Sequence, residues 1–122
     1  VLVRNALWRR VRLFAAEEIP TLGELDQPCG MGERRWRDVL ERFHEAHDEV
    51  LLDGDARSTA YFIVDETDEL ADHVWHVTQI FHDADSDNDF RIVADVDLDA
   101  TQDEGEVVFK GYRAGSIEDL AE

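Results

Sequence analysis

The chain has 122 residues and carries 12 basic against 30 acidic side chains, a formal net charge of −18. This length predicts one domain whose core buries roughly two thirds of the surface of the unfolded chain. The negative charge excludes a protein that binds a phosphate backbone over most of its surface. No run approaches the roughly 18 apolar residues of a membrane span. The single cysteine excludes a disulfide within the chain and suits a reducing cytoplasm.

The charge is divided unevenly along the chain. Residues 1–42 carry eight basic and seven acidic side chains, a net charge of +1, whereas residues 43–122 carry four basic and 23 acidic side chains, a net charge of −19. An acidic surface of this kind keeps a protein soluble, and it also suits the docking of a basic protein partner. The first interpretation is the simpler one, and the sequence leaves the second open.

The first predicted element is a helix over residues 2–18. Its apolar side chains recur at helical spacing on one face. They are Val3, Leu7, Val11 and Phe14. Pro20 and Gly23 then predict the end of this helix, and residues 23–32 are expected to form a loop or a short turn of helix.

A second helix is predicted over residues 33–50, because apolar side chains again recur at a period close to 3.6. Its core face comprises Trp36, Val39, Leu40, Phe43, His47 and Val50. The outer face is charged, so this helix is expected to lie on the surface of the domain with one side buried.

Four strands follow, predicted over residues 59–65, 74–82, 90–98 and 106–112. The third strand alternates apolar and polar side chains, so one of its faces is expected to be buried. Short connections between the last three strands favour antiparallel pairing, and the acidic tail, residues 116–122, is expected to fray. The sequence therefore predicts an α+β domain in which two N-terminal helices pack on a four-stranded antiparallel sheet. This arrangement resembles the nuclear-transport-factor-2-like fold.

Aspartates alternate along one predicted loop, which therefore has the opening of a calcium-binding loop. They are Asp83, Asp85, Asp87 and Asp89. Asn88 stands where such a loop has glycine, and Ala94 stands where a glutamate closes the shell of ligands. A second acidic stretch, residues 95–106, has a closing glutamate but lacks the glycine. Solvated acidic loops are the simpler interpretation of both stretches, so we expect no metal and no other cofactor in this chain.

A catalytic role has little support, since the chain contains no phosphate-binding loop and no nucleophile elbow. One candidate pocket remains, on the concave face of the predicted sheet. It would be lined by His47, Trp75, His76 and Gln79. A buried histidine beside a carboxylate can act as a general base. A hydrogen-bonded histidine of the core or its rim is the simpler interpretation, and we expect no enzymatic activity from this chain.

Arginines of the two predicted helices form a candidate contact surface for nucleic acid or for a neighbouring domain. They are Arg4, Arg9, Arg10, Arg12, Arg34 and Arg35. Arg34 and Arg35 precede Trp36, and basic side chains beside an aromatic ring are typical of nucleic-acid surfaces. Acidic residues share the second helix, so pairing of charges along the helix surface is the competing interpretation.

Several blocks of the sequence resemble the uncharacterised region that closes a group of bacterial DEAD/DEAH-box helicases. The blocks are RNALWRRV at residues 4–11, DARS at 55–58, VWHVTQIF at 74–81, DNDF at 87–90, VDLDA at 96–100 and GEVV at 105–108. The resemblance covers nearly the whole chain. It implies that residues 1–122 are a single domain at the C-terminal end of a larger helicase, with the motor that binds ATP and magnesium upstream. No catalytic residue is carried over to this chain.

The function that the resemblance implies is that of a non-catalytic accessory domain, which positions the nucleic acid or a protein partner. Its expected partners are the upstream helicase domains, nucleic acid bound through the arginines, and a basic protein. Two rival functions stay open. One is a small-molecule-binding or enzymatic domain of the nuclear-transport-factor-2-like type, which an enclosed pocket with convergent polar groups would favour. The other is a dimerisation module, which a flat exposed apolar face would favour.

Overall fold

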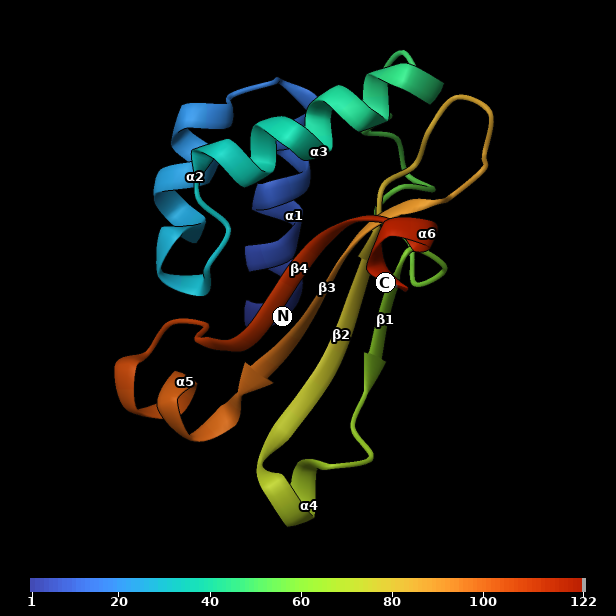
Figure 1. Cartoon of the computed structure of the whole chain (residues 1–122). Coiled ribbons are helices and arrows are strands. Elements are labelled where there is room, and N and C mark those ends of the chain that lie inside the picture. Colours follow the sequence, from blue (N-terminus) through green and yellow to red (C-terminus); the bar gives the residue numbers. More distant parts are fainter. Residues whose placement is uncertain (122) are drawn as a thin grey trace.

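The protein has an α+β fold in which helices cover one face of a four-stranded antiparallel sheet, as the sequence predicts (Figure 1). The computed structural model describes residues 1–121. The helical layer consists of α1 (Leu2–Ala15), α2 (Ile19–Asp26) and α3 (Glu33–Ala46). The strands are β1 (Phe62–Asp65), β2 (Val74–Ile80), β3 (Phe90–Asp97) and β4 (Phe109–Ser116), and they lie in the order β1-β2-β3-β4. Two short helices join strands, α4 (Glu69–Asp72) before β2 and α5 (Leu98–Glu104) before β4.

Helix α1 buries the predicted apolar stripe against the rest of the core. Val3, Leu7, Val11 and Phe14 are each at most 7% exposed. The helix ends at Ala15, earlier than predicted, and Glu17 turns the chain with a left-handed φ of 57°. The prediction of the buried face is therefore confirmed, although the boundary is shifted.

A separate helix, α2, contains the residues that were expected to end the first one. Pro20 lies in its first turn, where the N–H that proline lacks would have no intrahelical partner. Gly23 lies inside the helix, and a Cβ on it would be only 2.4 Å from the Cα of Glu33. Gly23 therefore allows α2 and α3 to touch. The short turn expected in this region is limited to a 3₁₀ helix, η1 (Gln27–Cys29).

Helix α3 presents the predicted core face and then ends before the predicted boundary. Its buried residues are Trp36, Val39, Leu40 and Phe43. His47 follows the last turn with an extended backbone, at a φ of −138°, and its side chain is 1% exposed. His47 is thus buried as expected, but it is held at the end of the helix rather than within it.

The sheet places one face against the helices. Strand β3 alternates as predicted, and Phe90, Ile92, Ala94 and Val96 are each at most 6% exposed. Val77 of β2 and Tyr112 of β4 lie opposite Ala94 in the strand register, so all three point to the same face. Strand β4 lies further along the chain than the predicted residues 106–112.

The C-terminal tail forms a short helix, α6 (Ile117–Leu120), beside β4. The hydroxyl of Ser116 accepts a hydrogen bond from the backbone N–H of Asp119 at 3.0 Å, which caps the first turn. Arg113 of β4 donates to the carbonyl of Leu120 at 3.0 Å. The structure thus gives a short helix to part of the tail that the sequence predicts to fray, and Glu122 lies outside the described residues.

Aromatic side chains join the helical layer to the sheet. Phe14 of α1 stacks on Phe81, with ring centroids 4.7 Å apart. It also meets Trp36 and Phe43 of α3, at centroid distances of 5.7 and 5.6 Å. These four rings are each at most 1% exposed, so they form the centre of the core. Within residues 1–121, no helix has the length and apolar character needed to cross a membrane.

Candidate functional site

The nearly neutral and the strongly acidic parts of the sequence occupy different parts of the fold. Residues 1–42, with a net charge of +1, build α1, α2 and most of α3, and the rest of the sequence, which includes the sheet and its loops, carries −19. The helices lie together on one side of the sheet (Figure 1). An anionic partner would therefore be steered toward the helical layer.

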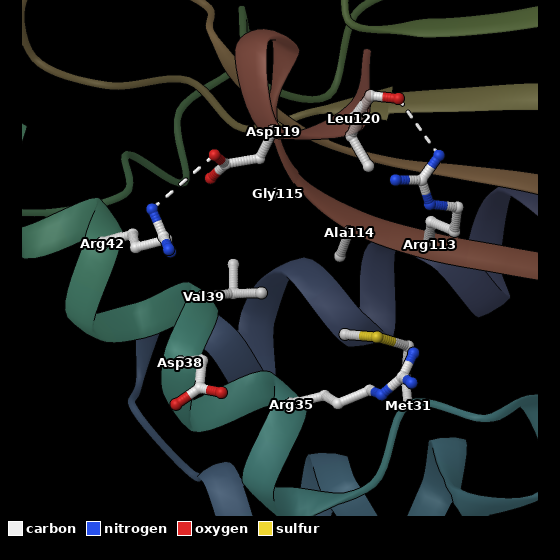
Figure 2. Close-up of a pocket in the computed structure, with 10 residues that line it drawn as sticks. All are labelled: Met31, Arg35, Asp38, Val39, Arg42, Arg113, Ala114, Gly115, Asp119 and Leu120. Carbon is white, nitrogen blue, oxygen red and sulfur yellow. Dashed lines mark hydrogen bonds and ion pairs between the residues drawn. The ribbon is translucent and has the colours of Figure 1, made fainter. Parts of the chain in front are cut away.

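An open groove lies where the helical layer meets β4 and α6 (Figure 2). Its volume is about 300 Å³. Its charged side chains are Arg35, Asp38 and Arg42 of α3, Arg113 of β4 and Asp119 of α6. Val39 and Ala114 add apolar surface between them. The groove thus combines three guanidinium groups from two elements that are far apart in the sequence.

The three guanidinium groups are held in different ways. Arg42 Nη1 lies 3.6 Å from Oδ1 of Asp119, and Arg113 Nη1 donates to the carbonyl of Leu120 at 3.0 Å. Figure 2 shows no ion pair between Arg35 and the other residues of the groove. Because a guanidinium has five N–H donors, each of the three arginines keeps donors for a ligand.

The groove suits a single phosphate or carboxylate group. A guanidinium is permanently charged and presents a flat fork of donors that matches such a group. Three arginines and two aspartates give the lining a net charge of +1. The groove can therefore attract one anionic group, but it is too weakly charged to hold a polyanion by electrostatics alone.

Four of the six predicted contact arginines lie exposed on the helical layer. They are Arg9, Arg12, Arg34 and Arg35. Arg4 is half-buried, and its guanidinium donates a hydrogen bond to the carbonyl of Arg57. Arg42 and Arg113 of the groove were not among the predicted residues. Arg113 belongs to the acidic part of the sequence, and only the fold brings it beside α3.

Arg10, the remaining predicted contact, is 7% exposed and cannot reach a partner. Its Nε lies 2.8 Å from Oδ1 of Asp26, which is fully buried. The indole N–H of Trp36 donates to the other oxygen of Asp26 at 2.9 Å. The guanidinium also lies over the rings of Phe109 and Tyr112, 5.1 and 5.7 Å from their centroids. Arg10 is therefore part of the core, stabilised by a carboxylate and two aromatic faces.

The four residues predicted to share a pocket lie in separate surroundings. Trp75 donates its indole N–H to Glu69 of α4 at 2.6 Å. Gln79 is 2% exposed and donates to the carbonyl of Tyr61 at 3.1 Å. His47 instead faces the loop between β2 and β3. These side chains therefore do not line one shared pocket on the concave face of the sheet.

His76, the fourth of these residues, points to the outer face of the sheet. Its Nδ1 lies 2.6 Å from a carboxylate oxygen of Asp95, and its Nε2 lies 2.6 Å from one of Asp68. These hydrogen bonds, first that to Asp95 and then that to Asp68, raise the pKa of His76 to about 9. His76 is therefore an imidazolium at neutral pH, a state that cannot accept a proton as a general base.

The loop between β2 and β3 folds around Asp83, which is 1% exposed. Oδ1 of Asp83 accepts the backbone N–H groups of Asp85 and Asp87 at 3.0 Å, and Oδ2 accepts that of Asn88 at 2.8 Å. Burial raises the pKa of Asp83, but the backbone hydrogen bonds outweigh it, so this pKa is below its usual range. Asn88 adopts a left-handed φ of 55°, a conformation that asparagine tolerates. Asn88 therefore makes the sharp turn for which the sequence predicts that a glycine is needed.

His47 lies against this acidic loop. Its Nε2 is 2.9 Å from Oδ1 of Asp89, and its Nδ1 is 3.7 Å from Oδ1 of Asp83 and from Oδ2 of Asp85. Burial lowers the pKa of His47, but the hydrogen bond to Asp89 and the nearby carboxylates outweigh this effect and raise it above its usual value. No spacing in the sequence links His47 to the loop. The only available signal was a histidine among apolar residues at the end of a helix.

These observations define a small α+β domain with an arginine-lined groove and a separate cluster of one histidine and several aspartates. Residues 1–114 match the model of a protein family described as a domain of unknown function, DUF3516. The chain belongs to this family. Comparison with curated proteins and with solved structures found no significant match.

Proposed function

We propose that this chain is a non-catalytic accessory domain of an ATP-dependent DEAD/DEAH-box helicase, and that it positions the nucleic-acid strand. The observation that carries this proposal is the groove of Figure 2, whose lining includes Arg35, Arg42 and Arg113. A guanidinium fork binds a phosphate through two parallel hydrogen bonds. The groove would hold one backbone phosphate of a single strand.

Other exposed arginines lie on the helical layer outside the groove. Arg34 is exposed beside Arg35 on α3, and Arg9 and Arg12 are exposed on α1. The acidic sheet repels the strand, which restricts contact to the helical layer. Because the net charge of the whole chain is −18, affinity is expected to be weak and sensitive to salt. Guidance of a strand that the motor already holds fits such weak binding.

The chemistry of unwinding is assigned to the upstream motor, where ATP and magnesium would bind. The resemblance of the blocks at residues 4–11 and 74–81 to the closing region of such helicases supports this assignment. A cytoplasmic location is part of the proposal, and the free thiol of Cys29 is consistent with a reducing compartment.

A basic protein is the second candidate partner. The observation that favours it is the acidic part of the chain, residues 43–122, which includes the sheet and its loops. Residues 43–122 carry a net charge of −19, which gives strong electrostatic complementarity to a basic surface. In that case the domain would dock its helicase to another protein, with the sheet and its loops as the contact.

The test is the binding of fluorescently labelled single-stranded RNA and DNA to this chain, measured by anisotropy from low to physiological salt. We expect salt-sensitive binding that Arg35→Glu and Arg42→Glu abolish. Arg37→Glu is the matched control. Arg37 is exposed on the same helix and carries the same charge, but it pairs with Glu33 at 2.9 Å and does not line the groove.

A loss of affinity confined to the two groove variants would support the proposal. An equal loss for Arg37→Glu would contradict it, because the effect would then follow net charge alone. No binding of wild-type protein at low salt would also contradict it and would favour the basic protein partner.

A further inference from the structure

A histidine–aspartate cluster lies away from the groove and has no part in the proposed strand contact. It consists of His47, Asp83, Asp85 and Asp87, and one donor atom of each lies within 4.8 Å of the others. The loop between β2 and β3, which carries the aspartates, lies beside the end of α3, which carries His47 (Figure 1). The sequence alone favoured a solvated acidic loop, and the buried histidine changes that interpretation.

The ring of His47 is oriented by a further carboxylate. Its Nε2 lies 2.9 Å from Oδ1 of Asp89. A carboxylate accepts hydrogen bonds, so Nε2 carries a proton and donates it to this oxygen. In the neutral ring, Nδ1 is then left with a free lone pair. A histidine that donates one N–H to a carboxylate while the other nitrogen binds an ion is the common arrangement in metal sites.

Nδ1 of His47 is an independent sign of a ligand. This atom is buried and has no hydrogen-bond partner among the described residues, and the whole side chain is 1% exposed. The carboxylate oxygens that face it, from Asp83 and Asp85, are each 3.7 Å away, too far for a hydrogen bond. A lone pair that faces two carboxylates in a buried site is unfavourable. A cation between them removes this conflict.

We propose that the cluster binds one divalent cation of the first transition row, with Nδ1 of His47 as its nitrogen ligand. Ligand atoms that are each about 2.0–2.2 Å from one ion can lie up to about 4 Å apart, and the observed 3.7 Å lies within that limit. The side chains of Asp85 and Asp87 are 69% and 60% exposed, so they can turn toward the ion. Asp83 is already fixed by the backbone of its loop.

The donor set determines which ions are expected. Imidazole suits zinc, iron and nickel, while carboxylates also suit manganese. Calcium prefers six to eight oxygen ligands and a bidentate glutamate, and Ala94 stands in the position of that glutamate. We therefore expect Zn²⁺ and Mn²⁺ to bind more tightly than Ca²⁺ and Mg²⁺.

The bound ion would tie the end of α3 to the connection between β2 and β3. His47 and Asp83 are both buried, and the chain after His47 already pairs with this connection through Val50 and Asp83. An ion that binds only the folded chain stabilises it by mass action. We therefore expect the bound ion to stabilise the fold and to raise the midpoint of thermal unfolding.

The test uses the whole chain without a histidine tag, stripped with a chelator and titrated with Zn²⁺ or Mn²⁺ by calorimetry. We expect one site per chain. Asp85→Asn and Asp87→Asn alter exposed side chains and should leave the fold intact, but each should weaken binding at least about tenfold. The matched control is Asp103→Asn, which removes the same charge from an exposed position on α5 and should leave the affinity unchanged.

A second readout, on the wild-type chain, avoids any loss of folding in a His47 variant. Nitrogen NMR of the histidine rings should show Zn²⁺ shifting the Nδ1 signal of His47 far more than its Nε2 signal. The proposal is overturned by the absence of a saturable site, by equal weakening in Asp85→Asn and Asp103→Asn, or by an unchanged Nδ1 signal. Each of these results would leave a proton, rather than a metal ion, on Nδ1.

Discussion

Two clusters of arginine and aspartate in this molecule share their chemistry and differ in burial. In the core, Arg10 and Asp26 are 7% and 0% exposed and lie 2.8 Å apart. In the groove, the side chains of Arg42 and Asp119 are 62% and 34% exposed and lie 3.6 Å apart. The first pair holds two helices together, whereas the second leaves N–H donors at the surface. Burial, rather than residue type, decides which arginines can meet a partner.

The physical reason is the desolvation of charge. A buried charge that loses its partner destabilises a protein by several kcal/mol, whereas an exposed ion pair contributes about 0–1 kcal/mol. In the core, Asp26 also accepts the N–H of Trp36, so the carboxylate serves two donors at once. Only the groove can exchange its ionic contacts for those of a ligand at small cost.

The largest expected effect is the loss of the buried carboxylate. Asp26→Asn should lower the free energy of unfolding by about 3–5 kcal/mol, because the charge of Arg10 remains buried without a carboxylate to balance it. Denaturation with urea measures the change. Asp38→Asn, an exposed aspartate of the groove, is the control and should stay within about 0.5 kcal/mol of wild type. A loss of less than about 1 kcal/mol for Asp26→Asn would contradict the distinction between the buried and the exposed ion pair.

A smaller loss should follow removal of the second donor to the same carboxylate. Trp36→Phe keeps an aromatic ring but removes the N–H that donates to Asp26 at 2.9 Å, and we expect a loss of about 1–3 kcal/mol. Trp75→Phe provides the comparison, because the N–H of Trp75 meets Glu69 at a half-buried position. The same denaturation experiment should give a smaller loss for Trp75→Phe. Equal losses would show that the burial of Asp26 is not decisive.

Removal of an exposed guanidinium should leave stability nearly unchanged while it weakens binding. Arg42→Gln breaks an ion pair with Asp119 whose partners are both solvated, so the free energy of unfolding should fall by at most about 0.5 kcal/mol. Affinity for single-stranded nucleic acid, measured on the same preparation, should fall clearly. If Arg42→Gln unfolded as readily as Asp26→Asn, the groove pair would be structural instead.

A further effect on stability concerns pH and a partly exposed histidine on the sheet. The carboxylates around His76 are Asp95 on β3, Asp68 before α4 and Asp65 opposite on β1. Its pKa is about 9 in the folded chain against an ordinary value of 6.5. Protonation therefore favours folding, and this stabilisation is complete below about pH 6.5 and is lost as the pH rises through about 9. Since the side chain is 42% exposed, the loss should be at most about 1 kcal/mol.

Unfolding by urea at several pH values, with His76→Gln beside wild type, isolates this contribution from other titrating groups. The decrease in stability between about pH 6.5 and 9 should be smaller in His76→Gln than in wild type. Identical profiles for the two proteins would show that the exposed contacts of His76 add nothing to stability.

The buried faces of the helices and of β3 were predictable because burial on one side imposes a period on the sequence. Val3 to Phe14 on α1, and the alternation in β3, follow that rule directly. The start of α2 was misread because proline marks the first turn of a helix as well as a boundary. The helix α6 had a local signal, a serine followed three residues later by an acidic residue at Ser116 and Asp119.

The functional sites were less predictable, because each depends on partners that are far apart in the chain. The sequence predicted that Arg10 lies on the surface, but in the fold it is surrounded by Asp26 and by aromatic rings of β4. His47 was expected to be buried, but its carboxylate partners come from a loop beyond two strands. The residue types were visible in the sequence, and only the fold decides which of them meet.

The contact between the groove arginines and phosphate is tested most directly by the salt dependence of single-strand binding. Each arginine that neutralises a phosphate adds about one to the slope of log K against log salt concentration. Arg35→Gln should therefore reduce this slope by about one, with no change in the free energy of unfolding, while Arg37→Gln should leave the slope as in wild type. An unchanged slope in Arg35→Gln, or an equal reduction in Arg37→Gln, would contradict a phosphate contact in the groove.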